Sequence, residues 1–235
     1  MVKKTVQGLM ALAVLLLSTG AAQAREIKFD VFVLGGGSTD VDARYFQSAD
    51  RQYHSRFDLG PKFTLGIAVP YGKLLSIETA YSAGPNNLFV TNTNVFPHVG
   101  VEYPVRVYIG SMSAVVHAPF ALFHLRPYAE GGVEYDRFSP TPAAITTAKN
   151  QGFAAVSTAT INHNNEFGMN LGAGVDRKIM KRVTFRLDLR DHITGSPRFG
   201  LPAEPNLSSS ATFPVAGHAN NIEYTAGIVF HLGKL

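Results

Sequence analysis

The last segment of the chain, residues 221–232, alternates between apolar and polar side chains. Ile222, Tyr224, Ala226, Ile228, Phe230 and Leu232 fall on one face, and Asn221, Glu223, Thr225, Gly227, Val229 and His231 fall on the other. A period of two residues is typical of a β-strand with two chemically different faces, and no helix would separate these residues in this way.

Seven earlier segments are also predicted to be strands. The eight predicted strands are 27–36, 56–69, 74–82, 105–118, 126–136, 167–176, 183–190 and 221–232. In the first, Phe29, Val31 and Val33 form the apolar face, and in the second Phe57 lies on the apolar face. The fourth strand is ambiguous, because 99–109 also alternates. A bulge at Gly110, where the parity would slip, would reconcile the two readings, with the residues before 105 extending an outer hairpin.

The links between these strands alternate in length. Residues 37–55, 83–103, 137–165 and 191–220 are long links, whereas 70–73, 119–125 and 177–181 are short. Eight antiparallel strands with short turns on one side and long loops on the other are typical of a transmembrane β-barrel, with periplasmic turns and extracellular loops. The fold class expected is therefore all-β.

A soluble eight-stranded barrel is the alternative, and it would turn its apolar faces inward. So narrow a lumen has little room for many Phe, Leu and Tyr side chains, whereas Gly, Thr, Asn and paired charges suit it. The apolar faces are therefore predicted to contact lipid. Bundled transmembrane helices are excluded, because mean hydropathy is only +0.05 and no second long apolar run follows the first.

The first 24 residues have the features of a secretory signal peptide. Lys3 and Lys4 precede the apolar run 9–17, and the small residues Ala22 and Ala24 mark a cleavage site. An anchor helix would need about 20 apolar residues. We expect cleavage after Ala24 and one domain, 25–235. The chain has no cysteine, which excludes a lipoprotein anchor, disulfides and thiolate metal sites.

Charged residues recur on the predicted inner faces. The predicted lumen charge network consists of Asp58, Lys62, Glu130, Glu134, Arg186, Asp188, Arg190 and Glu223. Lys28, Asp30 and Arg56 fall on the same faces of the first two strands. An unpaired charge is costly in a narrow interior, so these groups should form ion pairs that fill the barrel. The pairs expected are Arg186 with Glu130 and Arg190 with Glu223. A gated ion path is the alternative.

Other patterns indicate little chemistry. Gly35–Gly37 fits no phosphate-binding motif and reads as the start of a loop. The eight histidines have no metal-ligand spacing, and no metal or other cofactor is expected. His54 and Ser55, near Asp58, suggest a lipid hydrolase, but adjacent strand residues point to opposite faces and no nucleophile elbow is present. We expect no enzyme. With 21 basic against 17 acidic residues and no basic aromatic stripe, nucleic acid is not an expected partner.

Aromatic side chains recur near the predicted strand ends, where they would lie at the depth of lipid headgroups. They are Phe57, Tyr71, Tyr81, Phe120, Phe123, Tyr135, Phe167 and Tyr224.

The end of the chain resembles the assembly signal of bacterial outer-membrane barrels, through Thr225, Gly227, Phe230 and Leu232. It departs from the commonest form, because Gly233, Lys234 and Leu235 follow. The order of links resembles the small eight-stranded family of outer-membrane protein A, X and W types, without the periplasmic domain that tethers the first of these to the cell wall.

This resemblance implies a monomer in the outer membrane of a Gram-negative cell envelope. Its expected partners are outer-membrane lipids and lipopolysaccharide, the barrel-assembly machinery and periplasmic chaperones. The expected function is a structural or surface-interaction role of the extracellular loops. A narrow porin-like channel for small solutes and a lipid A-modifying enzyme are the alternatives.

Overall fold

The computed structural model describes residues 28–40, 53–92, 100–150, 161–195, 197–200 and 218–232. The predicted signal peptide and its cleavage site lie outside the described residues. One compact unit, Phe29–Leu232, contains all of the strands. Among the described residues, no helix is long and apolar enough to span a membrane.

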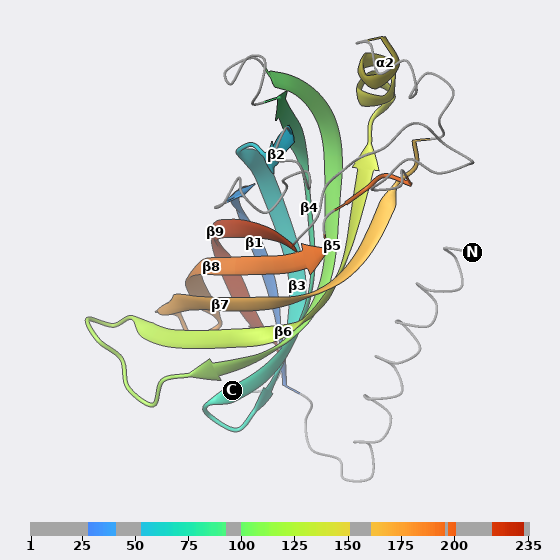
Figure 1. The fold of residues 1–235 in the computed structure, drawn as a ribbon. Helices are drawn as coiled ribbons and strands as arrows, with labels where there is room; N and C mark the ends of the chain where they lie inside the picture. The colour runs from blue at the N-terminus through green and yellow to red at the C-terminus, as the bar shows by residue number, and fades with distance from the viewer. Residues whose placement is uncertain are drawn as a thin grey trace. The chain divides into compact units, whose positions relative to one another are not determined.

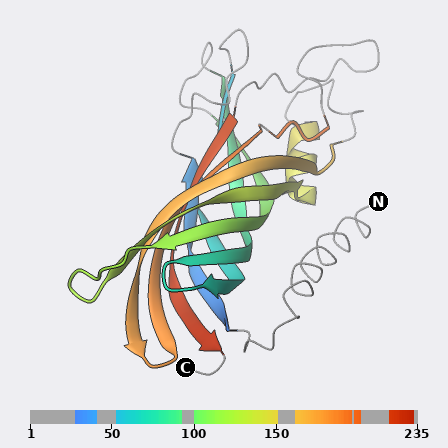
Figure 2. The same cartoon turned by 90° about the horizontal axis from the view of Figure 1, so that it is seen from below.

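Nine strands and one short helix make up the described part of the unit. They are β1 (Phe29–Asp40), β2 (Tyr53–Phe57), β3 (Gly60–Tyr71), β4 (Leu75–Asn92), β5 (Gly100–His117), β6 (Arg126–Pro140), α2 (Pro142–Asn150), β7 (Asn164–Met180), β8 (Val183–Gly195) and β9 (His218–Leu232). Every pairing is antiparallel, and the ring β1-β3-β4-β5-β6-β7-β8-β9 closes where β9 pairs with β1 (Figures 1 and 2). The predicted eight-stranded antiparallel barrel is confirmed, with β2 as an additional short strand beside β4.

The two ends of the barrel differ. Phe29 pairs with Leu232 at the end that also carries the three short connections, which we call the terminal end. The other four connections leave from the opposite end, the loop end. The predicted long link 83–103 is wrong for most of its length, because β4 and β5 pair without interruption from Leu75–Val116 to Thr91–Gly100. Backbone hydrogen bonds along this extended hairpin replace the expected loop.

The predicted bulge at Gly110 is wrong. The pairing of β5 with β4 and with β6 runs through Gly110 without a shift. What changes there is the chemistry of one face, because buried Val107 and Ile109 are followed on the same side by buried Ser111 and Ser113. Side chains along β5 therefore alternate regularly between the inside and the outside, but the inward ones change from apolar to polar near Gly110.

The parity slips instead between β2 and β3. Phe57 pairs with Leu88 on β4, and Phe63 pairs with Ala83, so residues 58–62 face the shorter stretch 84–87. The extra residue forms a bulge that reverses which side chains point inward. Phe57 is therefore buried inside, only 1% exposed, and its predicted place on the lipid-facing side is wrong.

The other strands follow the predicted parity. Along β1, Phe29 and Val33 are exposed on the outer face, whereas Phe32 and Leu34 are fully buried inside. β1 also continues through Gly35–Gly37 to Asp40, so the predicted loop start at Gly37 is wrong. A Cβ on Gly36 would lie 1.9 Å from the carbonyl oxygen of Tyr224, so glycine allows this close approach of strands.

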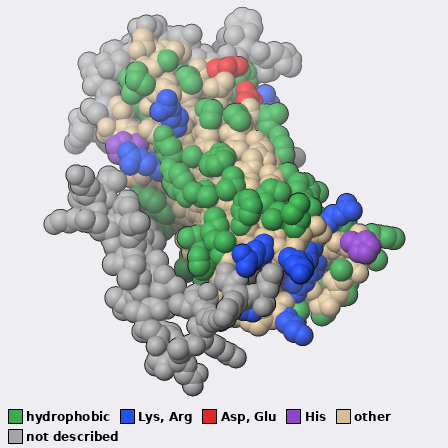
Figure 3. All heavy atoms as spheres, turned by 180° about the vertical axis from the view of Figure 1, so that it is seen from behind, with side chains coloured by type: hydrophobic (Ala, Val, Ile, Leu, Met, Phe, Trp, Pro, Cys, Tyr) green, Lys and Arg blue, Asp and Glu red, His purple; other side chains and the backbone are tan. Residues whose placement is uncertain are grey.

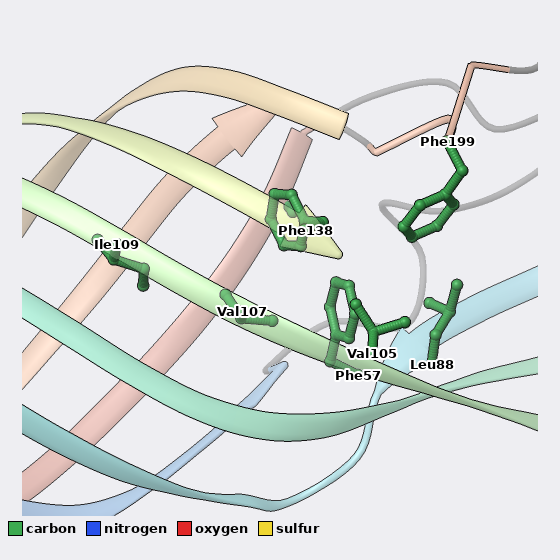
Figure 4. Close-up of a cluster of buried hydrophobic side chains, with 8 residues drawn as sticks. Phe57, Leu88, Val105, Val107, Ile109, Phe138 and Phe199 are labelled. Atoms are coloured by element: carbon green, nitrogen blue, oxygen red, sulfur yellow. The ribbon is translucent and has the colours of Figure 1, made fainter. Parts of the chain in front are cut away.

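The interior holds two apolar clusters. Phe32, Leu34, Ala68, Ala80 and Val229 pack together toward the terminal end. The loop-end cluster consists of Phe57, Leu88, Val105, Val107, Ile109, Phe138, Phe199 and Ala219. Figure 4 shows its side chains, with Phe199 entering from the segment that follows β8 and Phe57 beside Phe138. The rings of Phe57 and Phe138 stack at 5.4 Å, which helps close this end of the lumen.

Candidate functional site

An ion-pair network crosses the lumen between strands on opposite sides of the ring. Arg186 lies on β8, and Glu78 lies on β4, with three strands between them in either direction. Nη1 of Arg186 donates to Oε1 and Oε2 of Glu78 at 2.8 and 2.9 Å. Its Nε and Nη2 donate to Oδ1 and Oδ2 of Asp176 on β7 at 2.9 and 3.1 Å. The barrel is therefore bridged across its width.

Aromatic rings hold this guanidinium in place. Its carbon lies 4.7 Å from the ring centre of Tyr128 and 5.5 Å from that of Phe32. Attraction between a guanidinium and an aromatic face is stronger where water is excluded, and Arg186, Tyr128 and Phe32 are all buried. Fixed carboxylates and rings leave Arg186 little freedom to move aside.

A second group lies one step nearer the loop end. Nε and Nη2 of Arg190 donate to the two carboxylate oxygens of Glu130 at 2.5 and 2.9 Å, and Nη2 lies 3.3 Å from Oδ2 of Asp188. The hydroxyl of Tyr128 donates to Oδ1 of Asp188 at 2.6 Å. The predicted pair of Arg186 with Glu130 is wrong, because Glu130 binds Arg190 instead.

A third group surrounds His192. Nδ1 of His192 lies 2.7 Å from Oε2 of Glu134, and Nε2 lies 3.4 Å from Oε2 of Glu223. Glu223 also accepts hydrogen bonds from Thr64 at 2.8 Å and Ser82 at 2.9 Å. The predicted ion pair of Arg190 with Glu223 is wrong. The two residues do face each other across the β8–β9 ladder, but each side chain reaches a different partner.

Lys62 is the remaining cation of the predicted network, and it is buried in the same half of the lumen as His192, toward the loop end. Its Nζ has no hydrogen-bond partner, and neither do Oδ1 of Asp136 and Oε1 of Glu134. Buried polar atoms are usually satisfied by protein or by water. This part of the lumen is therefore less completely paired than the part around Arg186.

Asp58 is placed outside the network. It lies between β2 and β3, and its Oδ1 is 3.1 Å from Nε of Arg56, whose side chain is 51% exposed. The bulge at 58–62 turns this pair away from the lumen, so the inclusion of Asp58 was wrong, and so was the inward placement of Arg56. Lys28 is exposed as well.

The predicted network left out several residues of these three groups and of the region around Lys62: Glu78, Thr64, Ser82, Tyr128, Asp136, Asp176 and His192. His192 was missed because the seventh predicted strand ended at Arg190, whereas β8 continues to Gly195. Asp136 and Asp176 stand on predicted polar faces. Each is the last residue of its predicted strand, 126–136 or 167–176, and its position on the polar face was the only sign in the sequence that it would point into the lumen.

A smaller polar group joins three strands at the terminal end. Oδ1 of Asp30 on β1 lies 2.8 Å from Nδ1 of His231 on β9, and Nε2 of the same ring lies 2.8 Å from Oγ1 of Thr184 on β8. One imidazole therefore links the first and last strands at the seam where the barrel closes.

The predicted assembly-signal residues divide between the two faces of β9. Thr225 is buried inside, and Gly227 faces the same way, where a Cβ would lie 2.0 Å from the carbonyl oxygen of Val33. Phe230 and Leu232 are 44% and 41% exposed on the outer face. The hydrolase pair His54 and Ser55 is consecutive on β2. Over the residues that the structure describes, no group of three or more His, Asp or Glu could hold a metal ion.

Comparisons with known proteins identify the fold. No protein-family model matches the sequence, and no curated protein matches it significantly. The outer membrane protein OprG from Pseudomonas aeruginosa is similar in structure, with a TM-score of 0.58 at 11% identity over 88% of this chain and 97% of that one.

Weaker similarity extends to two further barrels. Neisserial surface protein A gives a TM-score of 0.49 at 13% identity, over 86% of this chain and 96% of that one. The N-terminal barrel domain of OprF from Pseudomonas aeruginosa gives 0.45 at 12% identity, over 88% of this chain and all of that one. The chain has the closed eight-stranded antiparallel barrel fold that it shares with OprG.

Proposed function

We propose that the chain is an integral outer-membrane barrel with a closed lumen, and that it acts as a structural or surface-interaction protein through its loop end. The observation that carries the proposal is the contrast between the inner and outer faces of the barrel wall. The inner face is filled by ion pairs, and the outer face is apolar. A soluble protein rarely leaves so much apolar surface exposed.

The outer face has the chemistry of a lipid contact. Figure 3 shows hydrophobic side chains over the middle of the face seen from behind, with Lys and Arg side chains toward both ends. The exposed outward residues include Val33, Leu65, Ile67, Met112, Val116, Val133, Leu171, Leu187 and Leu189, each at least 36% exposed. Lipid-facing apolar residues that alternate with a polar lumen are the pattern of membrane barrels.

Aromatic side chains border this apolar surface on its loop-end side. This aromatic row consists of Phe63, Tyr81, Tyr108, Tyr135, Phe167 and Tyr224, one on each of six strands. On β5, Arg106 and Val116 mark the two limits of the apolar stretch, and about ten residues at the usual rise and tilt span roughly 25 Å. That height matches the apolar band of outer-membrane barrels.

The closed lumen argues against free passage of solutes. Arg186 reaches from β8 to Glu78 on β4, and the loop-end cluster covers the lumen above. A narrow channel for small solutes is the second candidate. The buried Nζ of Lys62, which has no partner, is the observation that favours it, because such groups are commonly hydrated.

The proposed placement in the outer membrane also implies binding partners. Lipids would contact the outer face, including lipopolysaccharide at the loop end, and the long loops would meet extracellular partners. Export through the signal peptide, chaperone escort and insertion by the barrel-assembly machinery through the signal on β9 belong to the proposal, as does a monomeric state. The proposal includes no catalytic step, and an unchanged lipid A profile in a deletion strain would support that.

Conductance across a planar bilayer tests the closed lumen. We expect no steady conductance from the unmodified protein, and small openings from Arg186→Ala, because alanine removes the bridge across the lumen. Leu187→Ala on the outer face of the same strand is the matched control and should stay closed. A large, steady conductance of the unmodified protein would favour the channel instead.

A further inference from the structure

Two arginines stand on the outer face of neighbouring strands, close to the loop end. Arg106 on β5 lies between the buried residues Val105 and Val107, and Arg137 on β6 lies between the buried residues Asp136 and Phe138. Both therefore point outward. In the part of the chain that the structure describes, neither guanidinium forms an ion pair or a hydrogen bond. No described residue therefore forms an ion pair with either of these two charges.

The strand register brings the two arginines together. Arg137 pairs with Tyr108, and Arg106 is two residues farther along β5, opposite Ser139. Diagonal neighbours of this kind lie roughly 7–8 Å apart, with their Cβ atoms somewhat closer, a spacing at which two long side chains can reach one anion. Asn165 of β7 pairs with Arg137 from the other side, so hydroxyl and amide donors flank the guanidinium groups.

The arginines adjoin the aromatic row. Tyr81 and Tyr108 stack with ring centres 6.4 Å apart, and Tyr135 packs against Phe167 at 4.9 Å. Gly110 lies between these two pairs, and a Cβ there would meet only the carbonyl oxygen of Tyr135, at 3.9 Å. Gly110 therefore leaves bare backbone between Tyr81 and Tyr135, its partners on β4 and β6, on the terminal-end side of Arg106 and Arg137.

We propose that Arg106 and Arg137, with the tyrosines beside Gly110, bind a phosphate group of a phosphorylated glycolipid in the leaflet at the loop end. This inference rests on the proposed membrane placement and assigns the residues that contact lipopolysaccharide. Guanidinium groups match phosphate geometrically and bind it through several charge-assisted hydrogen bonds. Tyrosine rings are amphipathic and favour the headgroup depth at which this phosphate lies.

A glycolipid fits this site better than a phospholipid of the opposite leaflet. The arginines lie on the loop-end side of the aromatic row, whereas the exposed cations of the β7–β8 hairpin, Arg177 to Arg182, lie at the terminal end. The site also offers flat rings and polar Ser139 and Asn165 side by side, which suit a headgroup that is a sugar as well as an anion.

Lipid retention tests the assignment. The full barrel is inserted into phosphatidylcholine vesicles that contain bisphosphorylated lipid A, fully dephosphorylated lipid A or phosphatidylglycerol. After detergent extraction, the lipid that remains bound is measured by mass spectrometry. The test variant is R106Q/R137Q. The matched control is K181Q/R182Q, which removes the same charge from the exposed β7–β8 turn.

The unmodified barrel should retain bisphosphorylated lipid A in preference to the other two lipids. R106Q/R137Q should retain at least about tenfold less bisphosphorylated lipid A, because its charge-assisted hydrogen bonds are lost. K181Q/R182Q should retain as much as the unmodified protein. Equal retention by R106Q/R137Q would overturn the site, and equal retention of dephosphorylated lipid A would overturn the phosphate contact. Equal retention of phosphatidylglycerol would overturn the glycolipid. If the unmodified barrel failed to insert into any vesicle, the proposed function itself would fail.

Discussion

At the scale of single residues, Arg186 is the side chain on which closure of the lumen depends most. It donates to Glu78 on the opposite wall and to Asp176 on the neighbouring strand, and its side chain is only 4% exposed. A buried ion pair contributes little net stability compared with apolar packing. Removing one partner alone is costly, because the other charge is left unpaired in a poorly solvated place.

Arg186→Ala should therefore lower the free energy of unfolding by about 3–5 kcal/mol, and Glu78→Ala should also be destabilising. The double variant should be less destabilised than the sum of the two, because the second substitution removes the charge that the first one stranded. Urea unfolding in detergent micelles measures all three. The pair Arg186 and Glu130, which shares no contact, should show much smaller coupling and serves as the reference cycle.

Alanine substitutions at two glycines, Gly66 and Gly35, should affect stability very differently. A Cβ on Gly66 would lie 2.2 Å from Cζ of Phe32, a fully buried ring, whereas a Cβ on Gly35 would meet nothing within 4 Å. Gly66→Ala should cost about 1–3 kcal/mol through overpacking, and Gly35→Ala should be nearly neutral. Thermal unfolding of the two variants compares them directly, and equal losses would contradict the packing around Phe32.

At the scale of elements, tilt of the strands decides which inward charges meet. Following ladder partners from Glu78 leads through Ser113, Gly132 and Asn170 to His192. The carboxylate of Glu78 nevertheless meets Arg186, six residues away along β8. Hydrogen-bonded neighbours climb round a tilted barrel, so residues on one ladder path are not at one height. The predicted pair of Arg186 with Glu130 came from counts along each strand, whereas the register places Glu130 on the ladder path that runs through Gly172 to Arg190.

The outer face of β9 can be tested by a charge. Phe230 is 44% exposed and pairs with Val31 of β1 and Val183 of β8. Phe230→Asp would expose a carboxylate to lipid, at a cost of about 2–4 kcal/mol near the midplane and less near the interface. The folded fraction in vesicles should fall, while Phe230→Leu, the matched control, should fold normally. Normal folding of the aspartate variant would show that Phe230 does not face lipid.

At the scale of the whole molecule, closure of the ring gives each of its eight strands a partner on both sides, and only the short strand β2 lies outside the ring. β9 pairs with β1 over twelve residues, from Phe29–Leu232 to Asp40–Asn221, and the Asp30–His231–Thr184 contacts strengthen the terminal end of this seam. A closed barrel has no frayed edge from which detergent can begin to unfold it. Unfolding must therefore break many hydrogen bonds together.

The folded protein should resist detergent until it is heated. On a gel, the unheated sample should migrate at a different position from the boiled one, because the barrel stays compact. His231→Ala should lower the temperature at which the two bands exchange, since it removes both contacts at the seam. Migration of the unheated protein as a fully unfolded chain in every detergent would contradict closure.

The sequence by itself determined the eight strands of the ring, the three short links and three of the four long ones. It also determined which face of most strands is polar. These properties are local, because successive side chains of a strand point to opposite sides whatever its neighbours are. The inward placement of Glu130, Glu134, Arg186, Asp188, Arg190 and Glu223 followed from that alternation.

Only the tertiary structure decided which of these charges touch, where parity slips and how far strands extend. Ion-pair partners depend on the register accumulated over several ladders, which no single strand records. The bulge at 58–62 exists because β4 offers fewer residues than the opposing chain, and β4 and β5 lengthen because each supplies the other with hydrogen bonds. Direction along a strand is a property of the strand, whereas contact across the lumen is a property of the closed ring.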